Sequence, residues 1–229
     1  KPHLYAICCH GYSGQPQDMA KYAHRFARLG FTVLVPALRG HGLSEGRYAG
    51  MGWLDRRDLM RWISLIIDSD ADARILLQGK SMGAAAVMMT VGEPDLPRNV
   101  VAAVEDCGYA SVGQQFIDCA RSMFHLPKFL AKPIVTTMGA IARRRAGYGF
   151  QEASCVEQLK HATIPMLFIH GGADDFVPSR ALDENFDACA SIDRQKLLIP
   201  SAGHSMSAST APVVYWKTVT NFVTRVFGL

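Results

Sequence analysis

Ser81 stands between two glycines in the sequence GKSMG at residues 79–83, which has the spacing G-x-S-x-G. The apolar segment Arg74–Leu77 precedes this motif, and a run of strong helix formers follows it. A tight turn of this kind between a strand and a helix can present a serine hydroxyl to a site, where the oxygen acts as a nucleophile. A serine that only caps the helix is the structural alternative. Residues elsewhere in the chain distinguish the two.

An acid and a base that would activate Ser81 follow two other predicted strands. Asp174 lies in HGGADDFVP, after the apolar segment Pro165–Ile169, and His204 lies in AGHS, after Lys196–Ile199. Functional groups gather beyond the carboxyl ends of parallel strands, so we expect the three side chains to lie together. The order serine, aspartate, histidine along the chain is that of one version of the Ser-His-Asp triad.

The chemistry of such a triad gives each group a role. His204 would take the proton of the Ser81 hydroxyl at neutral pH and pass it to the leaving group. Asp174 would hold the imidazole in one tautomer and stabilise its charged form. The backbone N–H groups of Met82, directly after the serine, and of Tyr12, in the segment HGYSG, would donate hydrogen bonds to the oxyanion. We expect no metal and no organic cofactor, because this chemistry needs neither.

The elements that must position these residues alternate along the chain. Apolar, β-branched runs predict strands at Leu4–Cys9, Phe31–Val35, Arg74–Leu77, Val100–Val104, Pro165–Ile169 and Lys196–Ile199. Helical patterns lie between them at Asp18–Leu29, Asp55–Asp68, Met82–Val91, Arg180–Ala190 and Pro212–Phe227. This alternation predicts an α/β fold, a doubly wound and mostly parallel sheet with helices on both faces.

One interval departs from the alternation. Residues 111–160 show helical patterns interrupted by prolines and glycines, with no convincing strand. We therefore predict one α/β core made of residues 1–110 and 161–229, with a helical cap at 111–160 over the carboxyl edge of the sheet. Several apolar residues of this cap could line an acyl pocket or simply form the inner face of a cap helix: Phe116, Met123, Phe124, Leu126, Phe129 and Leu130.

The composition narrows the class of protein. Of 229 residues 49% are apolar and 19% are charged, with a formal net charge of +4, which is typical of a globular protein. No apolar run approaches the ~18 residues of a membrane span. The basic run Arg143–Arg145 lacks interleaved aromatic residues, so we expect no nucleic-acid partner.

The cysteines and the first residues bear on location. The six cysteines have neither disulfide nor metal spacing, and reduced thiols favour a cytoplasmic protein. The chain lacks an initiator Met and enters a strand at Leu4 almost at once. We therefore expect a segment before Lys1, and such a segment could carry an anchor at the cell surface.

Five motifs, in this order, resemble those of the α/β-hydrolases over essentially the whole chain: HGYSG, LRGHGLSEG, GKSMG, HGGADDFVP and AGHS. The segments YAGMGWLDRRDLMRWI and EDCGYAS resemble bacterial serine esterases of the cell-surface, prolyl-oligopeptidase-like or serine aminopeptidase-like branch. The resemblance implies an α/β-hydrolase fold with the triad placed as above. It also implies further strands before Leu4, so N-terminal strands are expected to be missing. Relatives often carry an acid where Ala37 stands.

Other residues compete for the triad roles. The resemblance aligns Asp174, and not its neighbour Asp175, with the acid of the family. Asp106 also ends a predicted strand, and some superfamily members take their acid from that position, so it stays an alternative. Lys80 beside the serine suggests a Ser-Lys dyad, but adjacent residues at a tight turn point in different directions.

The remaining histidines have structural interpretations. The resemblance gives His10 a role in shaping the oxyanion loop, and we expect His41 to order its own glycine-rich loop. His170 is expected to brace the loop of the acid. The others are predicted to be surface or packing residues: His3, His24, His125 and His161.

These residues together predict a serine hydrolase that cleaves carboxylic esters of a small-molecule substrate through an acyl-enzyme intermediate. A peptidase or amidase and a thioesterase or acyltransferase use the same machinery and stay open. A catalytically silent binding module of the same fold is a further alternative, which the intact set Ser81, Asp174 and His204 disfavours.

Overall fold

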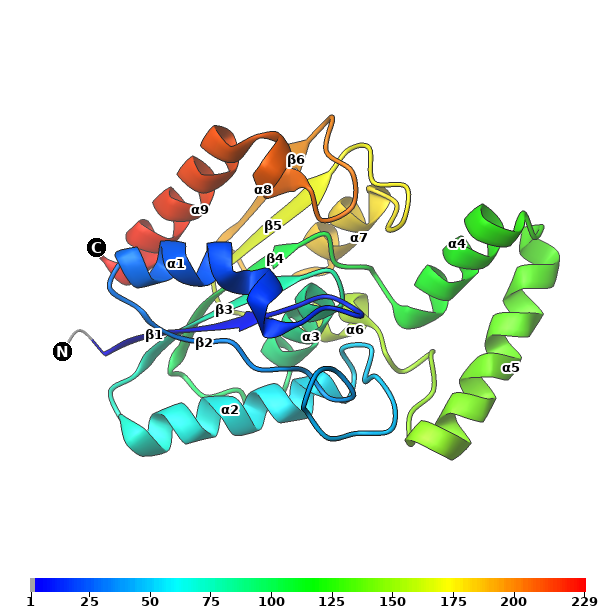
Figure 1. Cartoon of the computed structure of the whole chain (residues 1–229), viewed down its shortest axis with the longest axis horizontal. Helices are drawn as coiled ribbons and strands as arrows, with labels where there is room; N and C mark the ends of the chain where they lie inside the picture. The colour runs from blue at the N-terminus through cyan, green and yellow to red at the C-terminus, as the bar shows by residue number, and fades with distance from the viewer. Residues whose placement is uncertain (1–2) are drawn as a thin grey trace.

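The computed structural model describes residues 3–229 and contains a six-stranded sheet (Figure 1). In order across the sheet the strands are β2 (Thr32–Leu34), β1 (Leu4–Cys9), β3 (Arg74–Lys80), β4 (Val100–Asp106), β5 (Met166–Gly171) and β6 (Arg194–Ile199). Every neighbouring pair is parallel, which confirms the predicted doubly wound sheet. The carboxyl ends of all these strands therefore meet at one edge.

Helices cover both faces of the sheet. On one face lie α1 (Ala20–Arg28) and α9 (Pro212–Phe227), whose buried side chains share one core with the strands. On the other face lie α2 (Asp55–Ser69), α3 (Met82–Val91), α6 (Cys155–Leu159) and α7 (Arg180–Ala188). Two single turns, η1 (Pro16–Met19) and α8 (Ser207–Thr210), precede α1 and α9. The sheet therefore lies between two hydrophobic cores.

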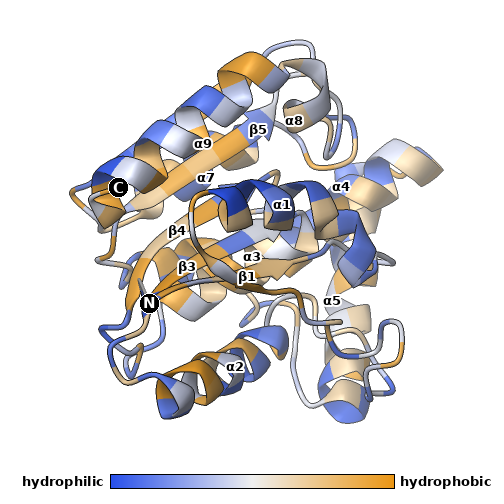
Figure 2. Cartoon of the chain, turned by 60° about the vertical axis from the view of Figure 1, so that its left-hand side comes forward, coloured by the Kyte–Doolittle hydropathy of each residue, from blue (hydrophilic) through white to orange (hydrophobic). Residues whose placement is uncertain are grey.

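The central strands are buried on both faces, as their continuous apolar sequences indicate. In β3, Leu76 belongs to the core under α1 and α9, whereas Ile75 and Leu77 belong to the other core. This alternation follows from the period of two of a strand. Figure 2 shows the same apolar character along β3, β4 and β5. Helix α3 is buried along its whole length, and its small residues Ala84–Ala86 let it lie close to the strands.

Two helices stand away from the sheet (Figure 1). They are α4 (Val112–Phe124) and α5 (Lys128–Ala146), which pack on each other, and we call residues 112–146 the cap hairpin. Helix α6 also falls within the predicted cap range of 111–160, but it packs against α3 and α7 of the core. The predicted domain boundaries thus stay a prediction, and the part that projects from the core is the cap hairpin.

The predicted ends of the elements are close to the observed ones. Helices α3 and α9 have the predicted bounds, whereas α1 begins at Ala20 and not at Asp18. The reason is local: Pro16 starts a 3₁₀ turn, in which the Asp18 carboxylate accepts a hydrogen bond of 2.8 Å from the Gln15 N–H. Within residues 3–229, no helix combines the length and the apolar composition that crossing a bilayer requires.

Candidate active site

Ser81 lies in a sharp turn between β3 and α3. Its backbone has φ 55° and ψ −118°, a combination that residues with a side chain rarely adopt. The flanking glycines make the turn possible by close approach. A Cβ atom on Gly79 would lie 2.2 Å from the Gly83 oxygen, and one on Gly83 would lie 2.2 Å from the Cys9 oxygen. The spacing G-x-S-x-G is therefore a requirement of backbone packing around the serine.

A chain of hydrogen bonds connects the three residues predicted to form a triad. The Ser81 Oγ lies 2.9 Å from the His204 Nε2. The His204 Nδ1 lies 2.7 Å from the Asp174 Oδ2. A carboxylate only accepts hydrogen bonds, so Nδ1 carries the proton and Nε2 is the acceptor for the serine hydroxyl. The structure thus brings together side chains from three separate strand ends.

The Asp174 carboxylate is buried and fully engaged. Its Oδ1 accepts hydrogen bonds from the N–H groups of Phe176 and Val177, at 3.0 and 2.8 Å. Its Oδ2 faces His204 and also lies 3.4 Å from the His170 Nε2. Burial disfavours the ionised form, but the hydrogen bonds from the two histidines outweigh it and hold the pKa of Asp174 well below its usual range. Asp174 is therefore a carboxylate at neutral pH.

The alternative acid, Asp106, occupies a different environment. Its Oδ2 accepts hydrogen bonds from the hydroxyls of Tyr215 and Tyr22, at 2.9 and 3.4 Å. Burial raises the pKa of this carboxyl. Within residues 3–229 it forms no hydrogen bond with His204, and the other neighbour considered, Asp175, is exposed. The geometry favours Asp174 over both.

The two backbone N–H groups predicted to bind the oxyanion are those of Tyr12 and Met82. Within the described chain, neither the Tyr12 N–H nor the Met82 N–H donates to another protein group. His10 shapes the loop of Tyr12: its Nε2 accepts from the Leu38 N–H at 3.0 Å, and its Nδ1 donates to the Gly11 oxygen at 2.8 Å. These two bonds define a neutral imidazole, and burial lowers the pKa of His10.

The second loop histidine, His41, connects two loops near the site. Its Nε2 accepts a hydrogen bond of 3.1 Å from the Ser13 N–H, in the loop that follows β1. Its Nδ1 donates to the Arg39 oxygen at 2.9 Å. His41 therefore fixes the segment RGHG against the segment HGYSG, which extends the role predicted for it.

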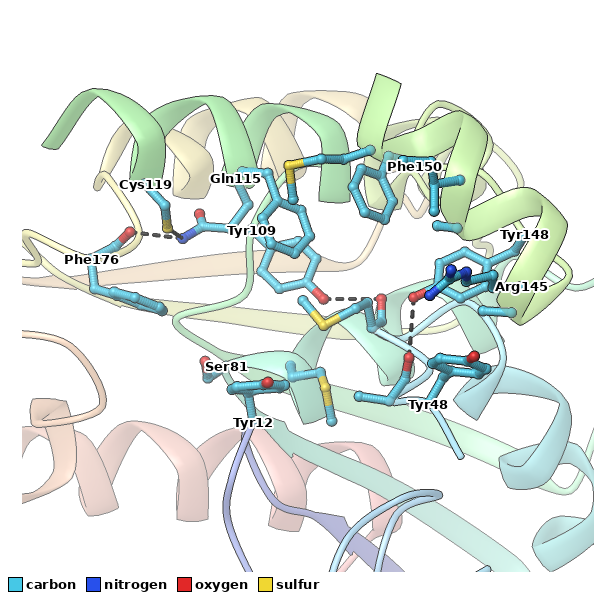
Figure 3. A pocket seen from close by; sticks show the side chains of 18 residues that line it. Tyr12, Tyr48, Ser81, Tyr109, Gln115, Cys119, Arg145, Tyr148, Phe150 and Phe176 are labelled. Carbon is cyan, nitrogen blue, oxygen red and sulfur yellow. Dashed lines mark hydrogen bonds between the residues drawn. The ribbon is translucent and has the colours of Figure 1, made fainter. Parts of the chain in front are cut away.

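A pocket of about 450 Å³ opens beside Ser81 (Figure 3). Figure 3 shows Ser81 and Tyr12 on the core side of this pocket and Gln115 and Cys119 of α4 on the opposite side. Most other side chains that line it are apolar or aromatic: Tyr48, Met51, Tyr109, Phe116, Met138, Ile141, Tyr148, Phe150 and Phe176. Among the described residues Arg145 is the only charged side chain in the lining. The pocket therefore suits the apolar part of a ligand whose polar group lies near Ser81.

More than half of the sequence matches one family of hydrolases. The family model described as serine aminopeptidase, S33, matches residues 1–140. The chain belongs to this S33 family, whose fold is that of the α/β-hydrolases. The membership confirms the resemblance that the five motifs carry.

Relatives of this S33 protein occur in bacteria. The uncharacterized protein YqkD of Bacillus subtilis is 26% identical over 95% of this chain and 70% of its own length. An uncharacterized protein of Mycobacterium tuberculosis is 28% identical over 87% of this chain, and the matched part is 62% of that relative. Among solved structures, the esterase Pf2001 of Pyrococcus furiosus has a TM-score of 0.78 at 18% identity, with 98% of this chain and 84% of that chain covered. That likeness is one of fold.

The apolar cap residues named in the sequence analysis of this S33 protein were predicted to line an acyl pocket or to form the inner face of a cap helix. Most of them do neither. Phe116 lines the pocket and stacks on Phe150, with ring centroids 4.7 Å apart. Met123, Phe124, Phe129 and Leu130 do not line it and are exposed, so they form neither an acyl pocket nor the inner face of a helix. The helical spacing of apolar residues predicted the helices of the cap, but it did not predict whether these residues face the pocket or the solvent.

Other residues of the site have weak sequence signals. The aromatic residues Tyr148 and Phe150 follow α5 and return under the cap, where the Tyr148 hydroxyl donates to the Ala49 oxygen at 3.1 Å. The sequence signal for these two residues is the segment GYGF at residues 147–150, in which aromatic residues alternate with glycines. Cys107 has its Sγ 3.4 Å from the Ser205 Oγ beside the triad, and burial raises the pKa of its thiol, so it is a neutral neighbour.

A buried carboxyl, Glu105, lies behind the acid loop of this S33 protein. Its Oε2 accepts a hydrogen bond of 2.9 Å from the Gly108 N–H, while its Oε1 has no partner among the described residues. Burial raises the pKa of Glu105 to about 8. The facing His170 has a raised pKa: burial lowers it, but Asp174 and Glu105 outweigh that effect. The His170 Nε2 donates to the Val177 oxygen at 3.0 Å, which braces the loop as predicted.

Proposed function

We propose that this protein is a serine hydrolase that cleaves carboxylic esters through an acyl-enzyme intermediate. Ser81 is the nucleophile, His204 the general base and acid, and Asp174 the group that orients His204. The N–H groups of Tyr12 and Met82 bind the oxyanion. No metal or organic cofactor takes part in these steps.

One observation carries the proposal. The hydrogen-bonded chain from the Ser81 Oγ to the His204 Nε2, and from the His204 Nδ1 to the Asp174 Oδ2, has lengths of 2.9 and 2.7 Å and begins at a serine in a strained turn beside an apolar pocket. A purely structural serine needs neither the strain nor the buried carboxylate behind the histidine. Membership of a hydrolase family supports the same conclusion.

In the first half of the reaction the Ser81 Oγ attacks the carbonyl carbon of the ester, and its proton passes to the His204 Nε2. The carbonyl oxygen becomes an oxyanion, which the N–H groups of Tyr12 and Met82 stabilise by about 3–4 kcal/mol for each well-placed donor. The C–O bond to the alcohol then breaks, and His204 returns the proton to the leaving alkoxide. Ser81 now carries the acyl group.

In the second half a water molecule replaces the alcohol. His204 takes one proton from the water, whose oxygen attacks the acyl carbon. The bond to the Ser81 Oγ breaks, and the proton passes from His204 to that oxygen. The products are a carboxylic acid and the original hydroxyl. Throughout, the Asp174 carboxylate stabilises the transient imidazolium and stays ionised, as its lowered pKa requires.

The apolar lining supports the proposal that the acyl side of the substrate binds in the pocket. Aromatic and aliphatic side chains surround the space beside Ser81, and burying an acyl chain there gains about 0.8 kcal/mol for each methylene group. Binding of a non-reacting part of the substrate in this way supports the positioning of the carbonyl at the nucleophile.

Labelling with a fluorophosphonate probe tests the nucleophile. The wild-type protein should form a covalent adduct and hydrolyse p-nitrophenyl esters. Ser81→Ala should lose the adduct and lower kcat by a factor on the order of 10⁴ or more. The matched control is Ser205→Ala, which removes a hydroxyl beside His204 in the sequence and should keep both activities. Turnover retained in Ser81→Ala, at an unchanged melting temperature, would refute the proposal.

A further inference from the structure

The cap hairpin carries large apolar side chains on its outside. Phe129 is 75% exposed and Phe124 is 70% exposed, and Met123 beside them is also exposed. All three lie at the tip, where α4 ends and α5 begins. Single apolar residues on a surface are ordinary, but several large exposed ones at one tip favour the binding of another molecule there.

An apolar stripe connects this tip with the pocket. Leu130, Ile134, Met138 and Ile141 follow one another along α5 at intervals of four, four and three residues, so they lie on one face of the helix. All four are exposed, and the last two also line the pocket beside Ser81. The stripe is thus a continuous apolar path from the tip to the candidate active site.

The charge of the same region has one sign. Residues 119–151 contain no Asp or Glu and carry six basic residues: Arg121, Lys128, Lys132, Arg143, Arg144 and Arg145. The whole chain has a net charge of only +4, so the rest of the protein carries a small net negative charge. The net positive charge of the chain therefore comes from residues 119–151, because the 18 other Lys and Arg residues are balanced by the 20 Asp and Glu residues elsewhere in the chain.

We propose that the tip of the cap hairpin docks on an anionic phospholipid bilayer. Phe124, Phe129 and their neighbours enter the interface between headgroups and acyl chains, while Lys128 and Lys132 bind lipid phosphates. The charge argues for this occupant over a second copy of the chain, because two such hairpins would repel each other.

Docking at this tip places the apolar stripe between the bilayer and the pocket. An ester held in the bilayer would then reach Ser81 along Leu130, Ile134 and Met138 without full exposure to water. This consequence, that lipid-borne esters are the substrate class, rests on the proposed function. The docking itself does not.

Vesicle cosedimentation tests the docking. The wild-type protein and Ser81→Ala should both bind vesicles made of equal parts phosphatidylglycerol and phosphatidylcholine, bind pure phosphatidylcholine vesicles weakly, and lose binding as salt is raised. The double variant Phe124→Ser with Phe129→Ser should lower the partition coefficient by about tenfold or more. Lys128→Glu with Lys132→Glu should lower it by a similar factor.

The matched control reverses two charges elsewhere. Arg28→Glu with Lys217→Glu changes exposed residues of α1 and α9 by the same total charge, and binding should stay within about twofold of wild type. Equal binding by the tip variants and the wild type would overturn the proposal, as would equal binding to both vesicle types. A dimer that depends on Phe124 and Phe129 in sedimentation equilibrium, without vesicle binding, would assign the tip to a second copy.

Turnover distinguishes the docking from the proposed function. With p-nitrophenyl palmitate embedded in the anionic vesicles, the Phe124→Ser with Phe129→Ser variant should lose about tenfold in rate, whereas its rate on soluble p-nitrophenyl acetate should stay within about twofold of wild type. Vesicle binding without any turnover would leave the docking in place and refute the hydrolase. Equal losses on both esters would refute delivery from the bilayer.

Discussion

At the carboxyl edge of the sheet each functional side chain is held by several neighbours, whereas across the pocket the cap hairpin leaves large side chains in solvent. The Asp174 carboxylate is buried and accepts hydrogen bonds from two N–H groups and from His204. Phe129 in the cap hairpin is 75% exposed. The two regions therefore differ in what they require. Reacting side chains need packing that fixes their positions, whereas the side chains of a surface that binds varied apolar molecules need no fixed positions.

The close packing that fixes the side chains at the carboxyl edge of the sheet also involves the backbone. A Cβ atom on Gly83 would lie 2.2 Å from the Cys9 oxygen, so α3 approaches β1 as closely as the chain allows. The cap hairpin has two glycines, Gly113 and Gly139, and a Cβ atom on either would meet Phe150 only at 3.4 Å. Substitutions at this edge and in the core should therefore cost more than substitutions in the hairpin, and four predictions test that contrast.

The largest effect is expected from the acid of the triad. Asp174→Asn should lower kcat/KM for p-nitrophenyl esters by about 10³–10⁴, because the amide no longer fixes the productive tautomer of His204. Asp106→Asn is the matched control at the neighbouring strand end, and it should cost less than about tenfold because its partners are Tyr215 and Tyr22. The reverse ranking in steady-state kinetics would move the acid to β4.

The next largest effect concerns packing under the sheet. Phe222→Ala in α9 should lower the free energy of unfolding by about 3–5 kcal/mol, because a fully buried ring leaves a cavity between α9 and the strands. Urea unfolding followed by circular dichroism measures it. A loss below about 1 kcal/mol would mean that this face of the core is loosely packed, and the contrast with the hairpin would weaken.

A smaller and pH-dependent effect is expected at Glu105. Its folded-state pKa of about 8 lies above its ordinary value of 4.5, so the folded protein keeps a proton that the unfolded chain releases between these pH values. The free energy of unfolding of the wild type therefore falls, through this group, as the pH rises from about 4.5 to 8. Glu105→Gln lacks this proton, and its carbonyl oxygen can still accept from the Gly108 N–H.

The stability of Glu105→Gln relative to wild type should thus increase from pH 5 to pH 8, by an amount on the order of a few kcal/mol. Melting temperatures of both proteins at the two pH values measure it. Melting curves of the two proteins that shift in parallel with pH would show that Glu105 titrates normally, and that water reaches this part of the edge.

The same contrast explains what could be read from the sequence. The parallel sheet and the positions of Ser81, Asp174 and His204 could be predicted from short motifs at strand ends. Such motifs are visible in the sequence because the local backbone allows only certain residues, as the close approach at Gly83 allows only glycine. The fold was thereby predicted, and the residues of the candidate site were named and lie together. Their roles stay a prediction until activity is measured.

Phe116 was named from the sequence as a possible pocket residue, but most of the pocket lining and the outward direction of the other cap residues could not be predicted. Tyr148 and Phe150 line the pocket only because the chain turns back toward the core after α5. A local sequence pattern does not predict a contact between segments that are far apart in the sequence. An apolar residue such as Phe124 is equally compatible with an inward and an outward position, since helical spacing fixes a face but not what the face meets. Tertiary packing decides the outcome.

The smallest effect is expected in the cap hairpin. Phe129→Ala should change the free energy of unfolding by no more than about 0.5 kcal/mol, because the ring is mostly in solvent and its removal opens no cavity. The urea experiment used for Phe222→Ala measures both variants side by side, at equal numbers of deleted atoms. A loss for Phe129→Ala close to that for Phe222→Ala would show that the hairpin folds over its apolar tip in solution, and the surface available for docking would be gone. A change of no more than about 0.5 kcal/mol for Phe129→Ala, beside a loss of about 3–5 kcal/mol for Phe222→Ala, would show that the exposed ring contributes little to the fold, as the docking proposed for it requires.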